Sequence, residues 1–171
     1  IHRLAMDRKP AGEAAPTSPT RGYLGGSGAD AVIDVMLYVS PRQRTPAEQQ
    51  AIRNLKRELR GMVQEGRRDA ALRRLSQRDA RELLDPVEFA DQRGKLALAY
   101  FVGGQDREAL RLAGASAREA GDLLPWVRWT AGLAAWRLGR RAEAVEQFQS
   151  VAMSDRASRT LRSGGAYWAS R

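Results

Sequence analysis

A short pattern that occurs twice, in the same register and 35 residues apart, limits the possible folds of this chain more than any other feature. The first copy reads Leu98-Ala99-x-Phe101-x-x-Gly104-x-x-x-Glu108-Ala109-Leu110, and the second reads Leu133-Ala134-x-Trp136-x-x-Gly139-x-x-x-Glu143-Ala144-Val145. A fixed period of about 34 residues is typical of repeated helix–turn–helix units. The repeat therefore predicts an all-α protein built from stacked antiparallel helix pairs.

Each position of the pattern has a role in such a pair. A small Ala beside a large aromatic ring lets two helices approach closely while the ring fills the space next to them. The Gly ends the first helix because it readily adopts the left-handed conformation of a C-terminal cap. The Glu-Ala step then begins the second helix, where the carboxylate suits the positive helix end.

Weaker copies extend the repeat in both directions. Upstream, Gly66 takes the place of Gly104 and is followed by Ala71. Downstream, Trp168 matches Trp136, but the sequence stops before the corresponding Gly. Half a repeat cannot bury its own apolar face. We therefore expect the chain to be a piece of a longer protein, with its repeat domain truncated at the C-terminal end.

Helix-start signals define the extent of the helical domain. Thr45-Pro46-Ala47-Glu48 is a capping box with proline at the first helical position, and Asp85-Pro86-Val87-Glu88 repeats the same signal. The apolar residues that follow the first signal at helical spacing are Ile52, Leu55, Leu59 and Met62. Together these signals predict about seven helices in a helical-repeat domain over residues 41–171.

Residues 1–40 differ in character and are expected to form a tail or linker. They are rich in Pro and Gly and present no periodic apolar face. Their one short apolar segment, residues 31–39, fits either a strand or a helix that docks on the repeats. No apolar run in the chain approaches the roughly 18 residues of a membrane span, so no transmembrane segment is predicted.

The chain is basic, with 29 Lys and Arg against 20 Asp and Glu and a net charge of +9. Between residues 40 and 82 twelve basic residues face six acidic ones, which favours anionic partners. Arg53, Arg57 and Arg60, with Lys56 beside them, line one helix face and are candidate ligand-binding residues. The alternative, which we favour, is a solvated face with i, i+4 ion pairs. Its acidic partners would be Glu58, Glu65 and Asp69.

The aromatic residues of the C-terminal part allow two interpretations. They could form a carbohydrate platform, or they could be wedges between repeat helices. The helical spacing of Trp129, Leu133 and Trp136 favours wedges, and Trp168 repeats the position of Trp136. Trp126, at an expected helix start, is the least constrained of the set and is a fourth candidate ligand-binding residue.

The sequence offers little for catalysis or metal binding. His2 is the one histidine and there is no cysteine, so a histidine-based nucleophile pair and a thiolate metal site are excluded. The Gly-rich stretch 22–28 lacks the Lys-Ser or Lys-Thr of a phosphate loop. No catalytic residue, metal site or cofactor is therefore predicted. Nucleic acid is disfavoured as a partner, because the aromatic residues are not interleaved with the basic ones.

Two stretches of the repeat resemble known families. Residues 134–148, Ala134-Ala135-Trp136-Arg137-Leu138-Gly139 followed by Glu143-Ala144-Val145-Glu146-Gln147-Phe148, resemble the tetratricopeptide (TPR) consensus. The longer stretch from Trp129 to Phe148, with Ser163-x-x-Ala166-Tyr167-Trp168-Ala169-Ser170-Arg171, is similar to the helical region of soluble lytic murein transglycosylases. The resemblance covers residues 45–171 and is specific from about residue 125. It implies a TPR-like α-solenoid.

The second resemblance implies a periplasmic protein that cleaves peptidoglycan glycan strands and forms a 1,6-anhydro sugar with one catalytic Glu. In that family the Glu lies in a Glu-Ser motif, followed by Gly-Leu-Met-Gln, and this sequence contains neither. The expectation is therefore a non-catalytic scaffold that positions glycan strands for a catalytic domain not present in this chain. The alternative is a TPR-like adaptor that binds a protein partner in its concave groove.

Overall fold

A computed structural model describes Gly12 and residues 38–171 of the 171-residue chain. Apart from Gly12, the described residues belong to one of the two units into which the chain divides, Asp34–Arg171. His2 and nearly all of the predicted tail, including residues 31–37 of its apolar segment, lie outside the described residues. The described part contains eight helices: α2 (Pro46–Gln64), α3 (Arg68–Leu75), α4 (Arg78–Leu83), α5 (Pro86–Val102), α6 (Asp106–Ala120), α7 (Pro125–Arg137), α8 (Arg141–Ala152) and α9 (Arg159–Ala169).

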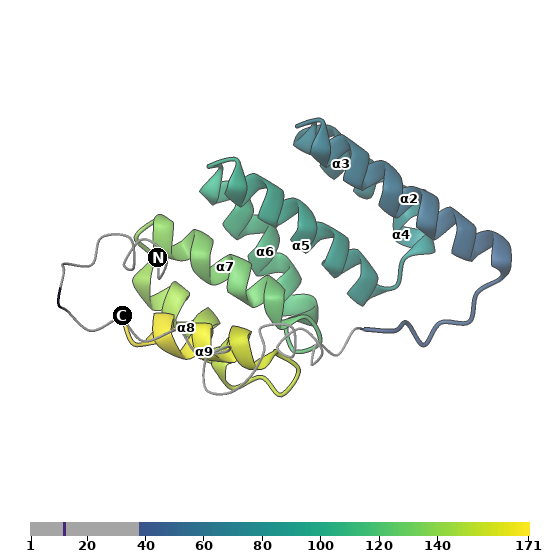
Figure 1. The fold of residues 1–171 in the computed structure, drawn as a ribbon. Coiled ribbons are helices and arrows are strands. Elements are labelled where there is room, and N and C mark those ends of the chain that lie inside the picture. Colours follow the sequence, from purple (N-terminus) through teal and green to yellow (C-terminus); the bar gives the residue numbers. More distant parts are fainter. Residues whose placement is uncertain (1–11, 13–37) are drawn as a thin grey trace. The chain divides into compact units, whose positions relative to one another are not determined.

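The helices pack in sequential antiparallel pairs, as the repeat predicts. α5 packs on α6 and α7 on α8, while α3 and α4 together form the partner of α2. The first helices of successive pairs also touch one another, α5 against α7 and α7 against α9. In Figure 1, α2, α5 and α7 run side by side with α6 behind them. We call the surface formed by α2, α5, α7 and α9 the inner face.

Both predicted helix starts are confirmed. The Thr45 hydroxyl accepts a hydrogen bond from the Glu48 amide, and the Glu48 carboxylate accepts one from the Thr45 amide. Asp85 and Glu88 make the same reciprocal pair at the start of α5. In each case one proline occupies the first turn, where its missing N–H costs no helical hydrogen bond.

The three predicted glycine caps are confirmed as copies of one turn. Gly66, Gly104 and Gly139 have φ values of +74°, +76° and +74°. At Gly139 the amide donates to the carbonyl of Trp136, and the next amide donates to the carbonyl of Ala135, which is the Schellman pattern. The other two glycines close their helices with the equivalent bonds. The weak upstream copy is therefore a true structural repeat.

The alanine five residues after each glycine lies in the core. Ala71, Ala109 and Ala144 are all completely buried, with exposed fractions of 0%. A side chain this small lets the second helix of each pair approach the first. Residues at the same distance from the cap glycine therefore make the same packing contact in each pair.

The aromatic residues act as wedges, which confirms the favoured interpretation for three of them. Trp129 on α7 meets Phe148 on α8 edge to face, with ring centroids 5.3 Å apart. Trp136 meets Trp168 of α9 in the same way and at the same distance. Phe148 is fully buried, and the three indoles pack against the main core cluster. These contacts join the last three helices.

The partner of α2 is divided into two short helices, α3 and α4. α3 ends at Leu75, where the Ser76 hydroxyl donates a hydrogen bond back to the carbonyl of Leu72. Such a bond competes with the next turn of the helix. α4 begins at Arg78, three residues after the end of α3, and its Ala80 is completely buried against the same core. Among the described helices, none is long and apolar enough to cross a membrane.

Candidate functional site on the inner face

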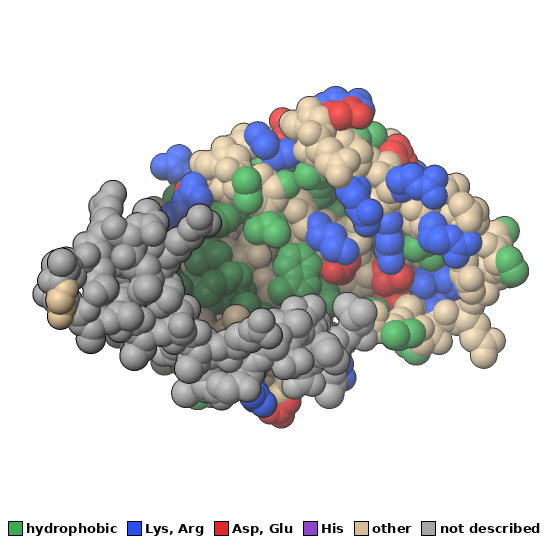
Figure 2. Space-filling view, viewed as in Figure 1, with side chains coloured by type: hydrophobic (Ala, Val, Ile, Leu, Met, Phe, Trp, Pro, Cys, Tyr) green, Lys and Arg blue, Asp and Glu red, His purple; other side chains and the backbone are tan. Residues whose placement is uncertain are grey.

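Positions counted back from the three cap glycines lie at equivalent points of the inner face, but they carry chemically different residues. Thirteen residues before each glycine the three pairs carry Arg53, Asp91 and Trp126, and six residues before it they carry Arg60, Leu98 and Leu133. The face is therefore basic in the first pair, mixed in the second and apolar in the third. Figure 2 shows Lys and Arg gathered over α2 and α5, beside a hollowed, mainly hydrophobic area over α7.

A pocket of about 370 Å³ lies where the four first helices come together, and we call it the Trp126 pocket. The half-buried indole of Trp126, Pro125 and Leu161 supply apolar lining. Lys56 and Lys95, from α2 and α5, also line it. The remaining polar residues of the lining are Tyr38, Glu88, Asp91, Arg156 and Ser158. Aromatic and charged groups thus meet in one cavity.

Trp126 owes its position to a glycine on the neighbouring helix. A Cβ atom on Gly94 of α5 would lie 2.8 Å from Cη2 of Trp126 and 2.6 Å from Cγ1 of Val127. Only a residue without a side chain lets α7 come this close to α5. Gly94 is a positioning residue that the sequence reasoning missed, although its place ten residues before Gly104 is equivalent to that of Trp129.

The two carboxylates of the Trp126 pocket are held in ion pairs. Glu88 accepts hydrogen bonds from Arg44 at 2.5 Å and from Lys56 at 3.1 Å, and its side chain is 11% exposed. Asp91 accepts from Lys95 at 2.5 Å and from the side-chain amide of its neighbour Gln92. The lysines and carboxylates along the pocket thus supply both donors and acceptors. Arg156 has no carboxylate partner among the described residues.

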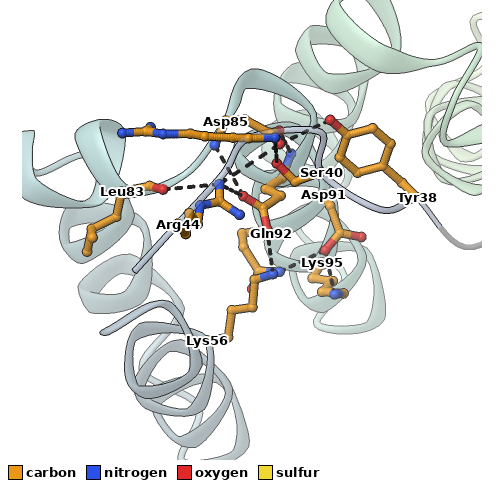
Figure 3. Close-up of polar contacts among 11 residues, drawn as sticks. Tyr38, Ser40, Arg44, Lys56, Leu83, Asp85, Asp91, Gln92 and Lys95 are labelled. Carbon is orange, nitrogen blue, oxygen red and sulfur yellow. Dashed lines mark hydrogen bonds and ion pairs between the residues drawn. The ribbon is translucent and has the colours of Figure 1, made fainter. Parts of the chain in front are cut away.

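A buried polar network connects the pocket to the segment before α2 (Figure 3). The guanidinium of Arg44 also donates to the carbonyl of Leu83 at 3.3 Å, and its side chain is 9% exposed. The Tyr38 hydroxyl donates to Asp85 at 3.0 Å. Burial alone would raise the pKa of the Asp85 carboxyl. Hydrogen bonds from Ser40, from backbone amides and from Tyr38 outweigh burial, so the pKa is lowered and the carboxylate is favoured.

A second, smaller cleft of about 210 Å³ lies between α2 and α5, and we call it the α2–α5 cleft. Its apolar lining is Leu59, Val63 and Leu96. Its polar lining is Lys56, Arg60, Gln92 and Lys95. Because Lys56 and Lys95 line both cavities, the cleft and the Trp126 pocket are neighbouring parts of the inner face.

The four candidate ligand-binding residues divide between these cavities and open solvent. Trp126 lines the pocket and Arg60 lines the cleft. Arg53 is exposed and donates to Gln50 through Nε and Nη2, at 3.1 and 2.7 Å. Arg57 is exposed and lines neither cavity. The structure therefore brings Lys56 and Lys95, rather than Arg57, to the centre of the basic area.

The expected i, i+4 pairing of the basic face is wrong. Glu58 pairs with Arg74 of α3, at 3.0 Å, and Glu65 pairs with Arg67 two residues away. Asp69 accepts a hydrogen bond from the hydroxyl of Tyr100 on α5, at 2.5 Å. Two of the three acids are thus used between helices. None of these three acids pairs with the arginines on the exposed side of α2.

Searches against protein-family models, curated proteins and solved structures returned no match to this chain. The fold defines the class of protein, an all-α chain of sequential antiparallel helix pairs, and the site has to be interpreted from its own chemistry. Among the described residues there is no cluster of three or more acidic or histidine side chains that could hold a metal ion. What the inner face does offer is two cavities with apolar surface and fixed charges side by side.

Proposed function

We propose that this chain is the non-catalytic helical scaffold of a periplasmic, peptidoglycan-cleaving lytic transglycosylase. In this role the inner face positions glycan strands for a catalytic domain that is not present in this chain. The observation that carries the proposal is the Trp126 pocket, where one indole and several charged side chains line a cavity of about 370 Å³. That volume falls in the range of roughly 300–1,000 Å³ typical of small-ligand sites.

The chemistry of the pocket suits a sugar ring. An indole offers a flat apolar surface to the C–H face of a pyranose, and it is amphipathic enough to stay partly exposed. The hydroxyl and acetamido groups of a sugar need both donors and acceptors at its edge. Lys56 and Lys95 provide donors, while the carboxylates of Glu88 and Asp91 provide acceptors. The nearly buried Glu88 carboxylate is held in place without the ligand by its ion pairs with Arg44 and Lys56.

The charge of the chain supports the same ligand. Peptidoglycan carries carboxylates on its peptide stems, and the described inner face is basic over α2 and α5. A strand with its sugar rings at Trp126 would place stem carboxylates within reach of this basic area. The sequence resemblance to transglycosylase helical regions favours the same arrangement.

The test is binding to purified sacculi and to soluble glycan fragments, with Trp126→Ala as the critical variant. Loss of an aromatic anchor should weaken fragment binding by about tenfold or more. The matched control is Tyr167→Ala, because Tyr167 is an aromatic residue that is 52% exposed and does not line the pocket. Circular dichroism and thermal unfolding establish that each variant is folded.

Two results would contradict the proposal. The wild-type chain could ignore sacculi and fragments while it retains a partner polypeptide, which is the pattern expected of a TPR-like adaptor. Alternatively, binding could vanish with added salt and be equal in the two variants. That result would mean that a basic chain adsorbs to an anionic polymer without using the pocket.

A further inference from the structure

The α2–α5 cleft combines an apolar floor with a cationic rim, and the proposed glycan site does not require it. Leu59, Val63 and Leu96 supply the apolar surface. Lys56 and Arg60 border it from α2, and Lys95 borders it from α5. The cleft exists because α2 packs mainly on α3 and touches α5 at few positions. α5 and α7 pack more closely on one another.

One of the three rim cations, Arg60, is left available by the described part of the protein. Lys56 and Lys95 are paired with Glu88 and Asp91. Arg60 has no acidic partner in the described part of the chain, because the acids expected to pair with this face are used elsewhere. Arg60 is exposed, so it can attract an anionic group, and that attraction should weaken as salt is added.

The size and lining of the cleft limit what it can hold. A volume of about 210 Å³ is below the usual range of small-molecule sites, which begins near 300 Å³, and is of the order of a single large side chain. No aromatic residue lines it, so neither a sugar ring nor a nucleobase finds a surface to stack on. An apolar side chain that inserts beside cations, as part of a longer acidic chain, satisfies both the floor and the rim.

We propose that the α2–α5 cleft docks an acidic segment of a partner polypeptide. The segment inserts one large apolar side chain against Leu59, Val63 and Leu96, and it places a flanking carboxylate on Arg60. Buried anchors surrounded by polar rims are the usual organisation of such interfaces. The proposal does not rest on the glycan function, because Leu59, Arg60, Val63 and Leu96 do not line the Trp126 pocket.

The test is fluorescence anisotropy of the full chain with a labelled short peptide, in which one Phe is flanked on both sides by Glu in a Gly/Ser background. The peptide should bind, and binding should weaken as salt is added. Replacing its Phe by Ser, or its Glu residues by Gln, should each lower the affinity by about tenfold. Equal binding of the Phe and Ser peptides would overturn the proposal, because the cleft would then play no part.

Variants of the protein locate the contact. Arg60→Glu should lower the affinity by about tenfold, whereas Arg57→Glu, the same charge change on the same helix outside the cleft, should lower it several-fold less. Arg60→Gln serves if the charge reversal disturbs folding. Val63→Phe should fill the cleft and abolish the dependence on the peptide's Phe. Equal effects of Arg60→Glu and Arg57→Glu would overturn the docking site.

Failure of this proposal can be told apart from failure of the glycan proposal. Trp126→Ala should leave peptide affinity unchanged, since Trp126 does not line the cleft. A large loss of peptide affinity in Trp126→Ala would show that the cleft belongs to the glycan site, and it would overturn the assignment to a protein partner.

Discussion

The close contact between α8 and α9 can be tested by adding a single methyl group. Gly165 of α9 is buried, and a Cβ atom there would lie 2.7 Å from the carbonyl oxygen of Phe148 and 2.9 Å from the amide nitrogen of Ala152. Both are backbone atoms of α8, so they cannot rotate away as a side chain would. Gly165→Ala must therefore push the two helices apart.

The expected size of the effect follows from two opposed terms. Replacing Gly by Ala inside a helix gains about 1 kcal/mol of helix propensity. Overpacking costs about 1–3 kcal/mol, and the upper part of that range applies because backbone must move. Gly165→Ala should therefore lose about 1–2 kcal/mol, and each kcal/mol lowers the Tm of a chain of this size by about 2–4 °C.

Gly61 of α2 provides the matched control, because the same substitution there should have the opposite sign. It lies in a helix interior, and a Cβ atom would find nothing within 4 Å. Gly61→Ala should raise the free energy of unfolding by about 0.5–1 kcal/mol. Thermal and urea unfolding followed by circular dichroism measure both variants. If Gly165→Ala raised the Tm as Gly61→Ala does, the close α8–α9 contact would be refuted.

Two further predictions concern a wedge and a cap. Trp136→Ala should lower the free energy of unfolding by about 3 kcal/mol, near the lower end of the range for large-to-small changes because the ring is only partly buried. A urea midpoint equal to that of the wild type would contradict the role of Trp136 as a wedge. Asp85→Asn should make the free energy of unfolding less dependent on pH in the acid range. Because the folded-state pKa of Asp85 is lowered, its carboxylate stabilises the fold above the unfolded pKa of about 3.9, and that stabilisation is lost as pH falls through the folded value. Urea midpoints across this pH range should therefore converge for the two proteins at low pH, and a constant difference would argue against the carboxylate's role.

Features that depend on a few neighbouring residues could be predicted from the sequence. A capping box is written in four consecutive residues, and both boxes form as expected. The glycine caps are equally local, because a left-handed residue after a helix is favourable for Gly and costly for others. Even the weak copy at Gly66 has the same φ and the same hydrogen bonds as the others.

Features that depend on the placement of different helix pairs could not be predicted. The partner of Glu58 is Arg74, and that choice follows from where α3 packs rather than from spacing along α2. The closeness of Trp126 to Gly94 likewise depends on the approach of α7 to α5. In both cases the sequence offers several partners of suitable chemistry. Only the tertiary structure decides among them.

The repeat itself separates residues that build the fold from residues free to bind. At the glycine, and at the alanine five positions later, the three copies agree, because every pair must close the same turn and bury the same contact. Thirteen residues before the glycine they differ completely, with Arg53, Asp91 and Trp126. Stacking does not require one residue type at that position, so its chemistry can differ between pairs and serve a ligand. The change from basic to aromatic along the inner face is therefore the place where a ligand of this protein should be sought.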